Sequence, residues 1–462
     1  MKTHAQIRPF GGRLIKWKGR VASIAPALAS VSVVALLATG AVGQTVIDTA
    51  LTGEQEITLD EDVTVTADGA ISVYTSSGLA DLYIDAADYS SVVTNNGLIE
   101  LSQTSASSPA GIWLAGNLTG GSILNNGEIT VEVYNSSSAS ATGIYVSGDV
   151  TGNIANAGTI DVYAEASSSS SAWAYGIDVS GSLSGVIANS GDITVEAKAY
   201  GSSSSAYTYA YGYGIRVGHG VGVDGEVVNS GSIEVSAQAF GSADASAYGI
   251  AILEDLDGTI TNSGDIVASA TAFYNHADAH ADGIRIIGDV NGSIINSGSI
   301  SASADNPYET ALAYGIQIEG VLNGTIDSSG TISATAQSTT DDASAWGIYV
   351  DGVGAEGLID VSGLIEVKAI TEGDGPTAYG IMINGELTGT IDTSGTISAT
   401  AESTYSDASA YGIYARTVGA EGQINVSGLI EAKASADSSY ADAYAIYVRN
   451  DGAGMAGDIV VS

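Results

Sequence analysis

Residues Gly258–Ile266 read GTITNSGDI, and close copies of this segment recur along the chain. GVIANSGDI at Gly185–Ile193 and GSIINSGSI at Gly292–Ile300 are two of these copies. In each copy a Gly-x-Ile segment leads into an Asn-Ser-Gly turn, where Asn and Gly tolerate positive φ. One such unit buries almost no apolar surface, so the pattern predicts a fold in which neighbouring copies stack.

A Gly-Ile pair returns with a similar period. Its eleven copies, the last of which reads Ala-Ile, follow one another at steps of 32 to 38 residues. A period of this length is typical of a solenoid, a propeller or another array. The copies begin at Gly111, Gly143, Gly176, Gly214, Gly249, Gly283, Gly315, Gly347, Gly380, Gly412 and Ala445.

Each repeat is predicted to hold three short strands, of which the Gly-x-Ile segment is the first. In the second, Ile193, Val195 and Ala197 alternate with polar residues, which is typical of a half-buried strand. The third follows a Ser-rich loop and carries the Gly-Ile pair. The sequence therefore predicts an all-β parallel β-helix of about eleven coils. A propeller is disfavoured, because its four-stranded blades use ~40–50 residues each.

The composition agrees with narrow, layered interiors. The 462 residues include 60 Gly but only 5 Pro, 3 Phe and 3 Met, so large core-filling side chains are scarce. Disorder is disfavoured, because 45% of the residues are hydrophobic and recur at regular places. The chain has no Cys, which excludes disulfides, thiolate metal sites and Cys nucleophiles.

The charge is strongly asymmetric. All 52 acidic residues follow residue 43, whereas six of the 13 basic residues lie within the first twenty. A surface of this charge repels nucleic acid and anionic membranes and attracts cations, so no nucleic-acid partner is expected. The other basic residues are scattered: Lys198, Arg216, Arg285, Lys368, Arg416, Lys433 and Arg449.

The N-terminus has the pattern of an export signal. Residues 1–20 are basic, residues 21–42 are apolar, and small residues precede a predicted cleavage between Gly43 and Gln44. A transmembrane anchor is the alternative, since about 20 apolar residues span a bilayer, but Pro26 and several Ser disfavour it. We therefore divide the chain into a signal peptide (1–43), an N-terminal cap with the first coils (44–110) and the repetitive β-helix (111–462).

A longer duplication lies in the C-terminal part. Residues 324–369 and 389–434 align without a gap at an offset of 65, with 35 of 46 positions identical. This offset corresponds to two coils and lengthens a surface rather than building a unique pocket. The last residues, Gly457–Ser462, match Gly422–Ser427, which Gly428 continues. The sequence therefore predicts a chain cut in mid-repeat, whose intact form continues.

Over residues 44–462 the chain resembles the passenger region of a bacterial autotransporter (type V secretion). The resemblance rests on the Gly-x-Ile-x-Asn-x-Gly-x-Ile units, the long export segment, the acidic repeats and the absence of Cys. It implies a parallel β-helix on the surface of a Gram-negative bacterium, at the outer membrane or outside it. It also implies adhesion, autoaggregation or biofilm formation, with surface glycans, proteins or further copies of the chain as partners. The C-terminal translocator barrel of that family is not in this sequence and is an expected partner.

One cluster has metal-ligating residue types at every second position, in the segment HADAHAD. In a strand these side chains face one side, and a His–Asp pair suits a surface Zn or Ni ion. The two His would be ~13 Å apart in an extended strand, so we favour a solvated polar face. The residues are His276, Asp278, His280 and Asp282.

Acidic residues also recur at one position of the repeat, where stacked carboxylates attract Ca²⁺. The chain lacks the Gly-Gly-x-Gly-x-Asp nonapeptide of calcium-binding β-rolls, so ordinary solvation is preferred and no cofactor is predicted. The residues are Asp244, Asp278, Asp342 and Asp407.

An aromatic residue often precedes the Gly of the Gly-Ile pair. These rings are predicted to pack on one another as a ladder, in preference to a groove that stacks on sugars. They are Tyr175, Tyr213, Tyr248, Tyr314, Trp346, Tyr379 and Tyr411. A similar column of Asn is predicted to be a turn-forming ladder: Asn95, Asn125, Asn156, Asn189, Asn229, Asn262 and Asn296.

No catalytic set is recognisable. After the predicted cleavage only His219, His276 and His280 remain as His, none in a nucleophile motif, and the Ser lie in low-complexity loops. We therefore predict an adhesive or structural protein that is not an enzyme. Two alternatives stay open. A β-helical enzyme acting on polysaccharide would need a non-repeating acidic and basic cluster on one face, and a cation-binding surface-layer component would be stabilised by Ca²⁺.

Overall fold

The computed structural model describes residues 44–52, 55–57, 61–73, 80–104, 108–168, 170–201, 208–449 and 456–462. The predicted signal peptide, with Gly43, lies outside these residues, and Gln44 opens the first strand. Over the described ranges, the chain contains no helix that is long and apolar enough to cross a membrane.

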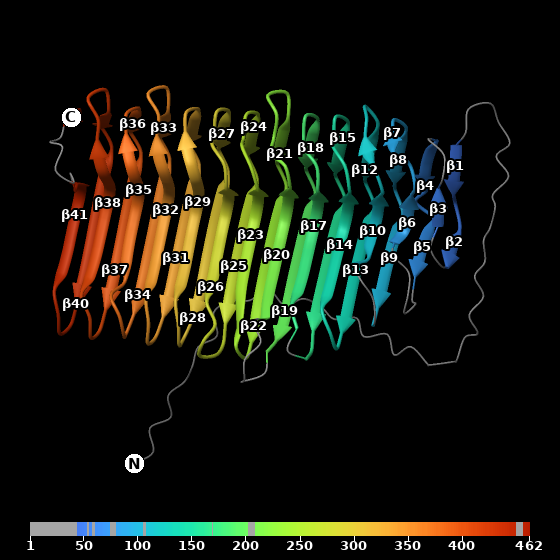
Figure 1. Ribbon diagram of the computed structural model, residues 1–462, viewed down its shortest axis with the longest axis horizontal. Helices are drawn as coiled ribbons and strands as arrows, with labels where there is room; N and C mark the ends of the chain where they lie inside the picture. Colours follow the sequence, from blue (N-terminus) through green and yellow to red (C-terminus); the bar gives the residue numbers. More distant parts are fainter. Residues whose placement is uncertain are drawn as a thin grey trace, which may run out of the picture. The chain divides into compact units, whose positions relative to one another are not determined.

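The described chain winds as a parallel β-solenoid. Each coil passes in turn through three sheets, and each strand pairs in parallel with the equivalent strands of the coils before and after it (Figure 1). We call the sheets A, B and C in the order in which a coil meets them. The predicted all-β parallel β-helix is therefore confirmed. Successive coils advance by ~4.8 Å, the spacing of neighbouring hydrogen-bonded strands.

The strands of each sheet follow the order of the coils. Sheet A contains β1 (Gln44–Ile47), β4 (Asp62–Val65), β8 (Val92–Asn95), β12 (Ser122–Asn125), β15 (Asn153–Asn156), β18 (Val186–Asn189), β21 (Glu226–Asn229), β24 (Thr259–Asn262), β27 (Ser293–Asn296), β30 (Thr325–Ser328), β33 (Leu358–Val361), β36 (Thr390–Thr393), β39 (Gln423–Val426) and β42 (Asp458–Val461). Sheet B contains β2 (Ala50–Thr52), β5 (Ala70–Val73), β9 (Leu98–Gln103), β13 (Glu128–Asn135), β16 (Thr159–Ala166), β19 (Asp192–Tyr200), β22 (Ser232–Phe240), β25 (Asp265–Ala272), β28 (Ser299–Asn306), β31 (Thr331–Ser338), β34 (Leu364–Thr371), β37 (Thr396–Ser403) and β40 (Leu429–Ala436). Sheet C contains β3 (Gln55–Ile57), β6 (Ala80–Ile84), β10 (Ala110–Leu114), β14 (Ala139–Val146), β17 (Ala172–Val179), β20 (Thr208–Val217), β23 (Ala243–Ile252), β26 (Ala279–Ile286), β29 (Ala311–Leu322), β32 (Ala343–Val353), β35 (Thr377–Leu387), β38 (Ala408–Val418) and β41 (Ala441–Val448). A short pair of strands, β7 (Asp88–Tyr89) and β11 (Asn117–Leu118), lies beside them.

The eleven Gly-Ile pairs lie on β10 to β41 of sheet C, in register from coil to coil. The segment 44–110, predicted as a cap with the first coils, forms strands of the same three sheets. The two-coil duplication is also visible, since its copies begin on β30 and β36, two places apart in sheet A.

The Gly of the Gly-Ile pair is needed because sheets B and C approach each other closely there. A Cβ added to Gly176 would lie 2.4 Å from the Cγ2 atom of Ile193 on sheet B. Ile177 is fully buried, so the pair places a small residue and a large one side by side inside each coil. This close approach explains the strict Gly-Ile period in the sequence.

The Gly of the Asn-Ser-Gly turn has a different role from the predicted one. None of the described Asn-Ser-Gly turns uses a positive φ. A Cβ added to Gly264 would instead lie 2.0 Å from the carbonyl oxygen of Gly231 in the coil before. These glycines are therefore required by the stacking of one turn on the next, not by turn conformation.

The interior consists of columns of β-branched and small residues. Buried Ile repeat in all three sheets, and buried Ala fill the narrower end between sheets B and C. A further buried column alternates Leu and Val between sheets C and A, so that large and small side chains interdigitate. Its first members are Leu118, Val150, Leu183, Val221, Leu256, Val290 and Leu322.

The seven Asn of the predicted column form one hydrogen-bonded ladder inside the solenoid. The Nδ2 of each of the first six donates to the Oδ1 of the next Asn over 2.7 to 2.9 Å, for example from Asn189 to Asn229 and from Asn229 to Asn262. Asn229 also donates to the carbonyl oxygen of Asp265, over 3.2 Å. The buried amides thus satisfy one another, as in stacked amide ladders of other β-structures.

Candidate functional site

The aromatic column stacks along the outer face of sheet C. Neighbouring rings lie nearly parallel, with centroid separations between 4.2 Å for Tyr314–Trp346 and 6.0 Å for Trp346–Tyr379. The rings stack in two runs, Tyr175 to Tyr248 and Tyr314 to Tyr411, and Tyr248 and Tyr314 are buried. The structure therefore places these residues as a packed ladder, whose faces are not free to stack on a sugar.

The ladder is interrupted in one coil, where Asp282 takes the register position of the ring between Tyr248 and Tyr314. The ring of His280 fills this gap, with its centroid 5.8 Å from that of Tyr248 and 5.4 Å from that of Tyr314. His280 Nε2 lies 2.8 Å from Asp282 Oδ1, and Asp282 is completely buried. Two of the four predicted metal-ligating residues thus form a pair within the ladder.

Arg285 extends this pair into a charged cluster on sheet C. Its Nε lies 3.9 Å from Asp282 Oδ2, and its Nη2 donates to Glu319 over 2.6 Å. Its Nη1 donates to the hydroxyl oxygen of Tyr248, and its guanidinium lies 5.2 Å from the centroid of that ring. The sequence pattern alone does not predict this cluster. Aligning the residues that follow each Gly-Ile pair would have shown Asp178, Arg216 and Arg285 as the charged members of one column.

A second ion pair, with a buried carboxylate, lies nearer the N-terminus in the same column. Arg216 Nε lies 3.6 Å from Asp178 Oδ1, and the guanidinium covers the ring of Tyr175 at 5.3 Å from its centroid. Burial raises the pKa of Asp178 to about 6, although the nearby Arg216 opposes this shift. Desolvation therefore outweighs the attraction of the two charges.

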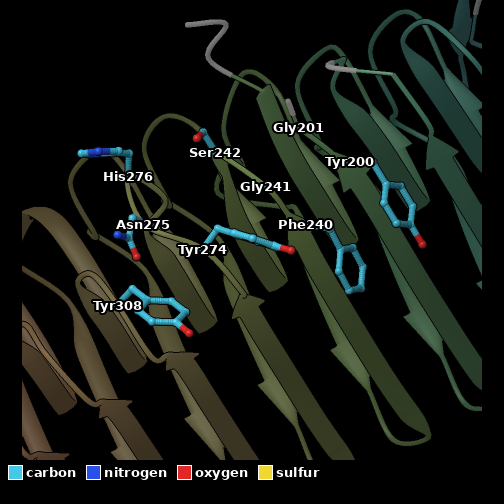
Figure 2. A pocket seen from close by; sticks show the side chains of 9 residues that line it. All are labelled: Tyr200, Gly201, Phe240, Gly241, Ser242, Tyr274, Asn275, His276 and Tyr308. Carbon is cyan, nitrogen blue, oxygen red and sulfur yellow. The ribbon is translucent and has the colours of Figure 1, made fainter. Parts of the chain in front are cut away.

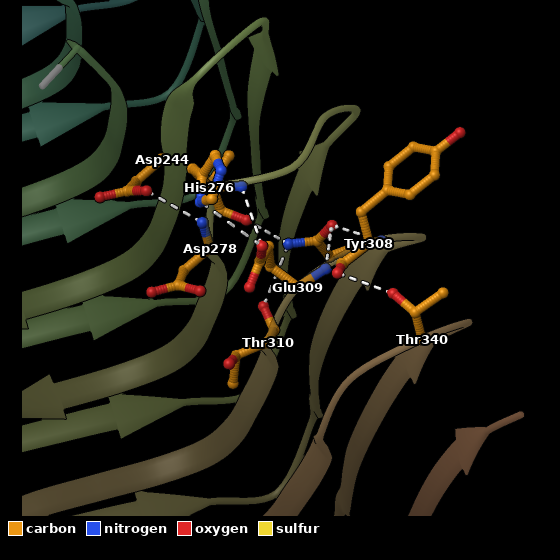
Figure 3. Close-up of polar contacts among 9 residues, drawn as sticks. Asp244, His276, Asp278, Tyr308, Glu309, Thr310 and Thr340 are labelled. Carbon is orange, nitrogen blue, oxygen red and sulfur yellow. Dashed lines mark hydrogen bonds and ion pairs between the residues drawn. The ribbon is translucent and has the colours of Figure 1, made fainter. Parts of the chain in front are cut away.

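His276 and Asp278 lie apart from the other two residues of the HADAHAD segment. The prediction of a continuous strand is wrong for His276, which has a φ of 68° in the turn before β26. Its Nδ1 lies 3.8 Å from Glu309, while the amide of Asp278 donates to Asp244 Oδ1 over 2.9 Å (Figure 3). Among the described residues these four side chains do not converge on one metal position.

The predicted acidic column is only partly continuous. Asp244 and Asp278 are neighbours in register, and burial, followed by the charge of Asp244, raises the pKa of Asp278. Asp342 lies further along the solenoid, where its carboxylate gathers with those of Asp341 and Asp374. Asp407 instead accepts hydrogen bonds from Ser439 and from the amide of Tyr440, which lower its pKa. The described carboxylates therefore form separate local groups.

A hollow of about 660 Å³ lies at the edge between sheets B and C. Four successive coils each contribute one aromatic side chain to it, and Figure 2 shows these rings along the edge. The rings belong to Tyr200, Phe240, Tyr274 and Tyr308. Ser242, Asn275 and His276 supply polar groups, and Gly201 and Gly241 leave room between the loops.

One wall of this hollow is a short aromatic stack. Tyr200 and Phe240 are paired in register, and their ring centroids are 4.7 Å apart. Phe273 continues the stack at 4.7 Å from Phe240. All three rings are partly exposed. Large apolar side chains that are exposed side by side often mark an interaction site.

The loops at the other wall are held by a buried amide. Asn306 is completely buried, and its Oδ1 accepts from the amides of Tyr308 and Glu309 over 3.0 and 3.2 Å. Its Nδ2 donates to the carbonyl oxygen of Ala277, in the loop of the preceding coil. Thr340 in the following coil donates to the carbonyl oxygen of Tyr308 over 2.7 Å (Figure 3). The backbone that carries Tyr308 is thus fixed from both sides.

A family model of the BigA third pectate lyase-like domain matches residues 10–284, which is more than half of the chain. No curated protein and no solved structure matches the chain. The family description names a pectate lyase-like domain, and the parallel β-solenoid observed here agrees with that description. The chain belongs to the family of the BigA third pectate lyase-like domain.

Proposed function

We propose that this chain is a surface-displayed β-solenoid that attaches cells to other surfaces and does not catalyse a reaction. The observation that carries the proposal is the aromatic hollow at the edge of sheets B and C. It is formed by exposed rings that four coils add to a scaffold whose own packing does not require them. Such exposed apolar groups on a soluble scaffold are typical of interaction sites.

The sequence supports the location in this proposal. The basic and apolar N-terminal segment has the pattern of an export signal, and the repeats resemble those of autotransporter passengers. The acidic surface keeps a long solenoid soluble outside the cell and reduces its self-association through charge repulsion. Surface glycans or surface proteins are the proposed partners.

The test compares cells that express the intact gene with cells that carry an in-frame deletion of residues 44–462. Protease treatment of whole cells measures display, since a protein on the surface is cleaved while cytoplasmic markers survive. Attachment to a glycan-coated or abiotic surface, together with sedimentation of the culture, measures adhesion. We expect the deletion to lower attachment several-fold. Equal attachment of the two strains, with the protein shown on the surface, would contradict the proposal.

Cleavage of a polysaccharide is the second candidate function, and the cluster around Asp282 favours it. His280, Asp282 and Arg285 bring an acid, a base and a cation together on one face, which is the kind of cluster that a β-helical enzyme needs. Against catalysis, Asp282 is completely buried, and its charge is already shared between the two neighbours. Release of unsaturated or reducing ends from polysaccharides by the wild type, lost in His280→Ala, would support this candidate.

A further inference from the structure

We infer that the hollow lined by Tyr200, Phe240, Tyr274 and Tyr308 is a binding site for a neutral glycan. The inference rests on the proposed function and deepens it, because it names the site and the chemical class of the partner. A glycan is recognised by ring faces that cover its C–H groups and by polar groups that bind its hydroxyls. The hollow offers both kinds of group on adjacent coils.

The ring faces available to a ligand belong mainly to Tyr274 and Tyr308. Tyr274 is 57% exposed and Tyr308 is 46% exposed, and neither ring packs on another ring within the described part of the chain. This differs from the column on sheet C, where neighbouring rings stack on one another. The negative face of an aromatic ring attracts the weakly positive C–H groups on one side of a pyranose.

The spacing of the rings favours a polymer that runs along the solenoid. Tyr200, Phe240, Tyr274 and Tyr308 come from four successive coils, which repeat at ~4.8 Å. This step is comparable to the rise per residue of an extended glycan. A glycan that runs along the solenoid axis can therefore place each sugar, or every second sugar, beside a ring of a successive coil.

The loops between the rings supply the polar groups that bind the hydroxyls of the glycan. Ser242 and Asn275 line the hollow, and both side chains donate and accept hydrogen bonds. The imidazole of His276 is largely exposed beside them. The backbone under this wall is held in advance by Asn306, so little conformational entropy is lost when a ligand binds.

The charge around the hollow excludes polyanionic glycans. His276 is the only basic side chain among the described residues that line it. Asp244, Asp278 and Glu309 lie next to the His276 loop, and burial raises the pKa of Asp244 and of Asp278. A uronic acid polymer would bring further negative charge to this surface, which repels it. A neutral hexose or N-acetylhexosamine polymer carries no such penalty.

The experiment measures binding of the purified full chain to defined glycans by calorimetry and by affinity electrophoresis. Laminarin, hydroxyethyl cellulose and chitohexaose are the neutral probes, and polygalacturonate is the anionic probe. The double variant Tyr274→Ala/Tyr308→Ala removes the two exposed ring faces. Tyr405→Ala is the matched control, because Tyr405 is 71% exposed on the same edge between β37 and β38 and lies outside the hollow.

We expect at least one neutral probe to bind and polygalacturonate not to bind. The affinity of the double variant for the neutral probe should fall at least about tenfold, whereas that of Tyr405→Ala should stay unchanged. The inference is overturned if no neutral probe binds, if polygalacturonate binds equally well, or if the double variant binds like the wild type. Circular dichroism and the melting temperature verify that each variant folds. Adhesion without glycan binding would overturn only this inference, whereas glycan binding without adhesion would overturn only the proposed function.

Discussion

The central and C-terminal coils make the same turn with different side chains at its first position. In the central coils, buried Asn from Asn95 to Asn296 form a continuous hydrogen-bonded ladder. In the C-terminal coils the same column holds Ser328, Val361, Thr393 and Val426. The Oγ of Ser328 accepts from Asn296 over 3.2 Å and so ends the ladder without an unsatisfied amide.

The comparison shows that the turn does not depend on the Asn side chain. In a central coil the amides of Ser230 and Gly231 donate to the carbonyl oxygen of Asn189, over 2.7 and 3.2 Å. In a C-terminal coil the amides of Ser394 and Gly395 donate to Val361 in the same way, over 2.9 and 3.0 Å. The backbone therefore makes the turn, and the Asn side chains add a second set of bonds between coils. These side-chain bonds stabilise the solenoid where each buried Asn has a neighbouring Asn or Ser as its partner.

The two regions also differ on the outer face of sheet C. In the central coils the residue after the Gly-Ile pair is charged at Asp178, Arg216 and Arg285. In the C-terminal coils the same position holds Tyr349, Tyr414 and Tyr447, whose rings pack edge-on against the main ladder. The central region thus uses polar contacts inside and outside, whereas the C-terminal region replaces many of them with apolar packing.

Breaking the ladder in its middle has the largest expected effect. Asn229→Val leaves Asn262 Oδ1 without its donor and Asn189 Nδ2 with only its bonds to the carbonyl oxygens of Gly191 and Ser232. It also removes the bond from Asn229 to the carbonyl oxygen of Asp265. Each unsatisfied buried group costs about 1–3 kcal/mol, so we expect a loss of about 3–5 kcal/mol in the free energy of unfolding, measured by urea denaturation.

The matched control is Thr393→Val, at the same column position in the C-terminal coils. Thr393 is buried, and its Oγ1 has no hydrogen-bond partner among the described residues. We expect this change to leave stability unchanged or to raise it by about 1 kcal/mol. If Asn229→Val were as well tolerated as Thr393→Val, the ladder would not be a stabilising element.

The pH dependence of the central coils has the next largest effect. Burial raises the pKa of Asp178 in the folded state to about 6, from an ordinary value of 3.8. The folded state then binds the proton more tightly than the unfolded state, so stability is highest below pH 4 and falls as the pH rises to 6. We expect a loss on the order of 2–3 kcal/mol over this range relative to Asp178→Asn.

Urea denaturation of both proteins between pH 4 and pH 7 measures this difference. Only the change with pH is compared, because the Asn side chain itself alters stability by an amount that does not depend on pH. Parallel pH profiles for wild type and Asp178→Asn would show that Asp178 titrates normally in the folded protein.

The doubled aromatic column of the C-terminal coils has the smallest expected effect. Tyr414 packs edge-on against Tyr379 and Tyr411 and stacks on Tyr447 at 5.5 Å. Tyr414→Leu keeps most of the apolar volume and loses the ring contacts, so we expect a loss of about 1 kcal/mol. Thermal denaturation measures it, with the exposed Tyr405→Leu as a control that should change stability by less than about 0.5 kcal/mol.

The repeat period predicted most of the fold, because stacking imposes the same residue at the same place in every coil. The Gly-Ile pairs, the three strands and the Asn ladder all follow from this period. The period did not predict the role of Gly264, since the steric limit there comes from a carbonyl of the preceding coil and not from its own φ.

The candidate sites were harder to predict, because they depend on departures from the repeat. The hollow combines side chains that lie about 34 residues apart along the chain and follow loops of different length, such as Phe240 and Tyr274. The cluster at Asp282 could not be predicted, because it depends on the His280 ring filling the gap in the aromatic ladder. Neither arrangement is visible until the coils are in register.

The central claim is that this regular solenoid acts through the hollow lined by Tyr200, Phe240, Tyr274 and Tyr308, and whole-cell attachment tests it most directly. Cells displaying the wild type, Tyr274→Ala/Tyr308→Ala or Tyr405→Ala at equal surface levels are compared on the same neutral-glycan coating. The account predicts that the double variant attaches no better than the deletion strain, while Tyr405→Ala attaches like the wild type. Full attachment by the double variant would contradict it.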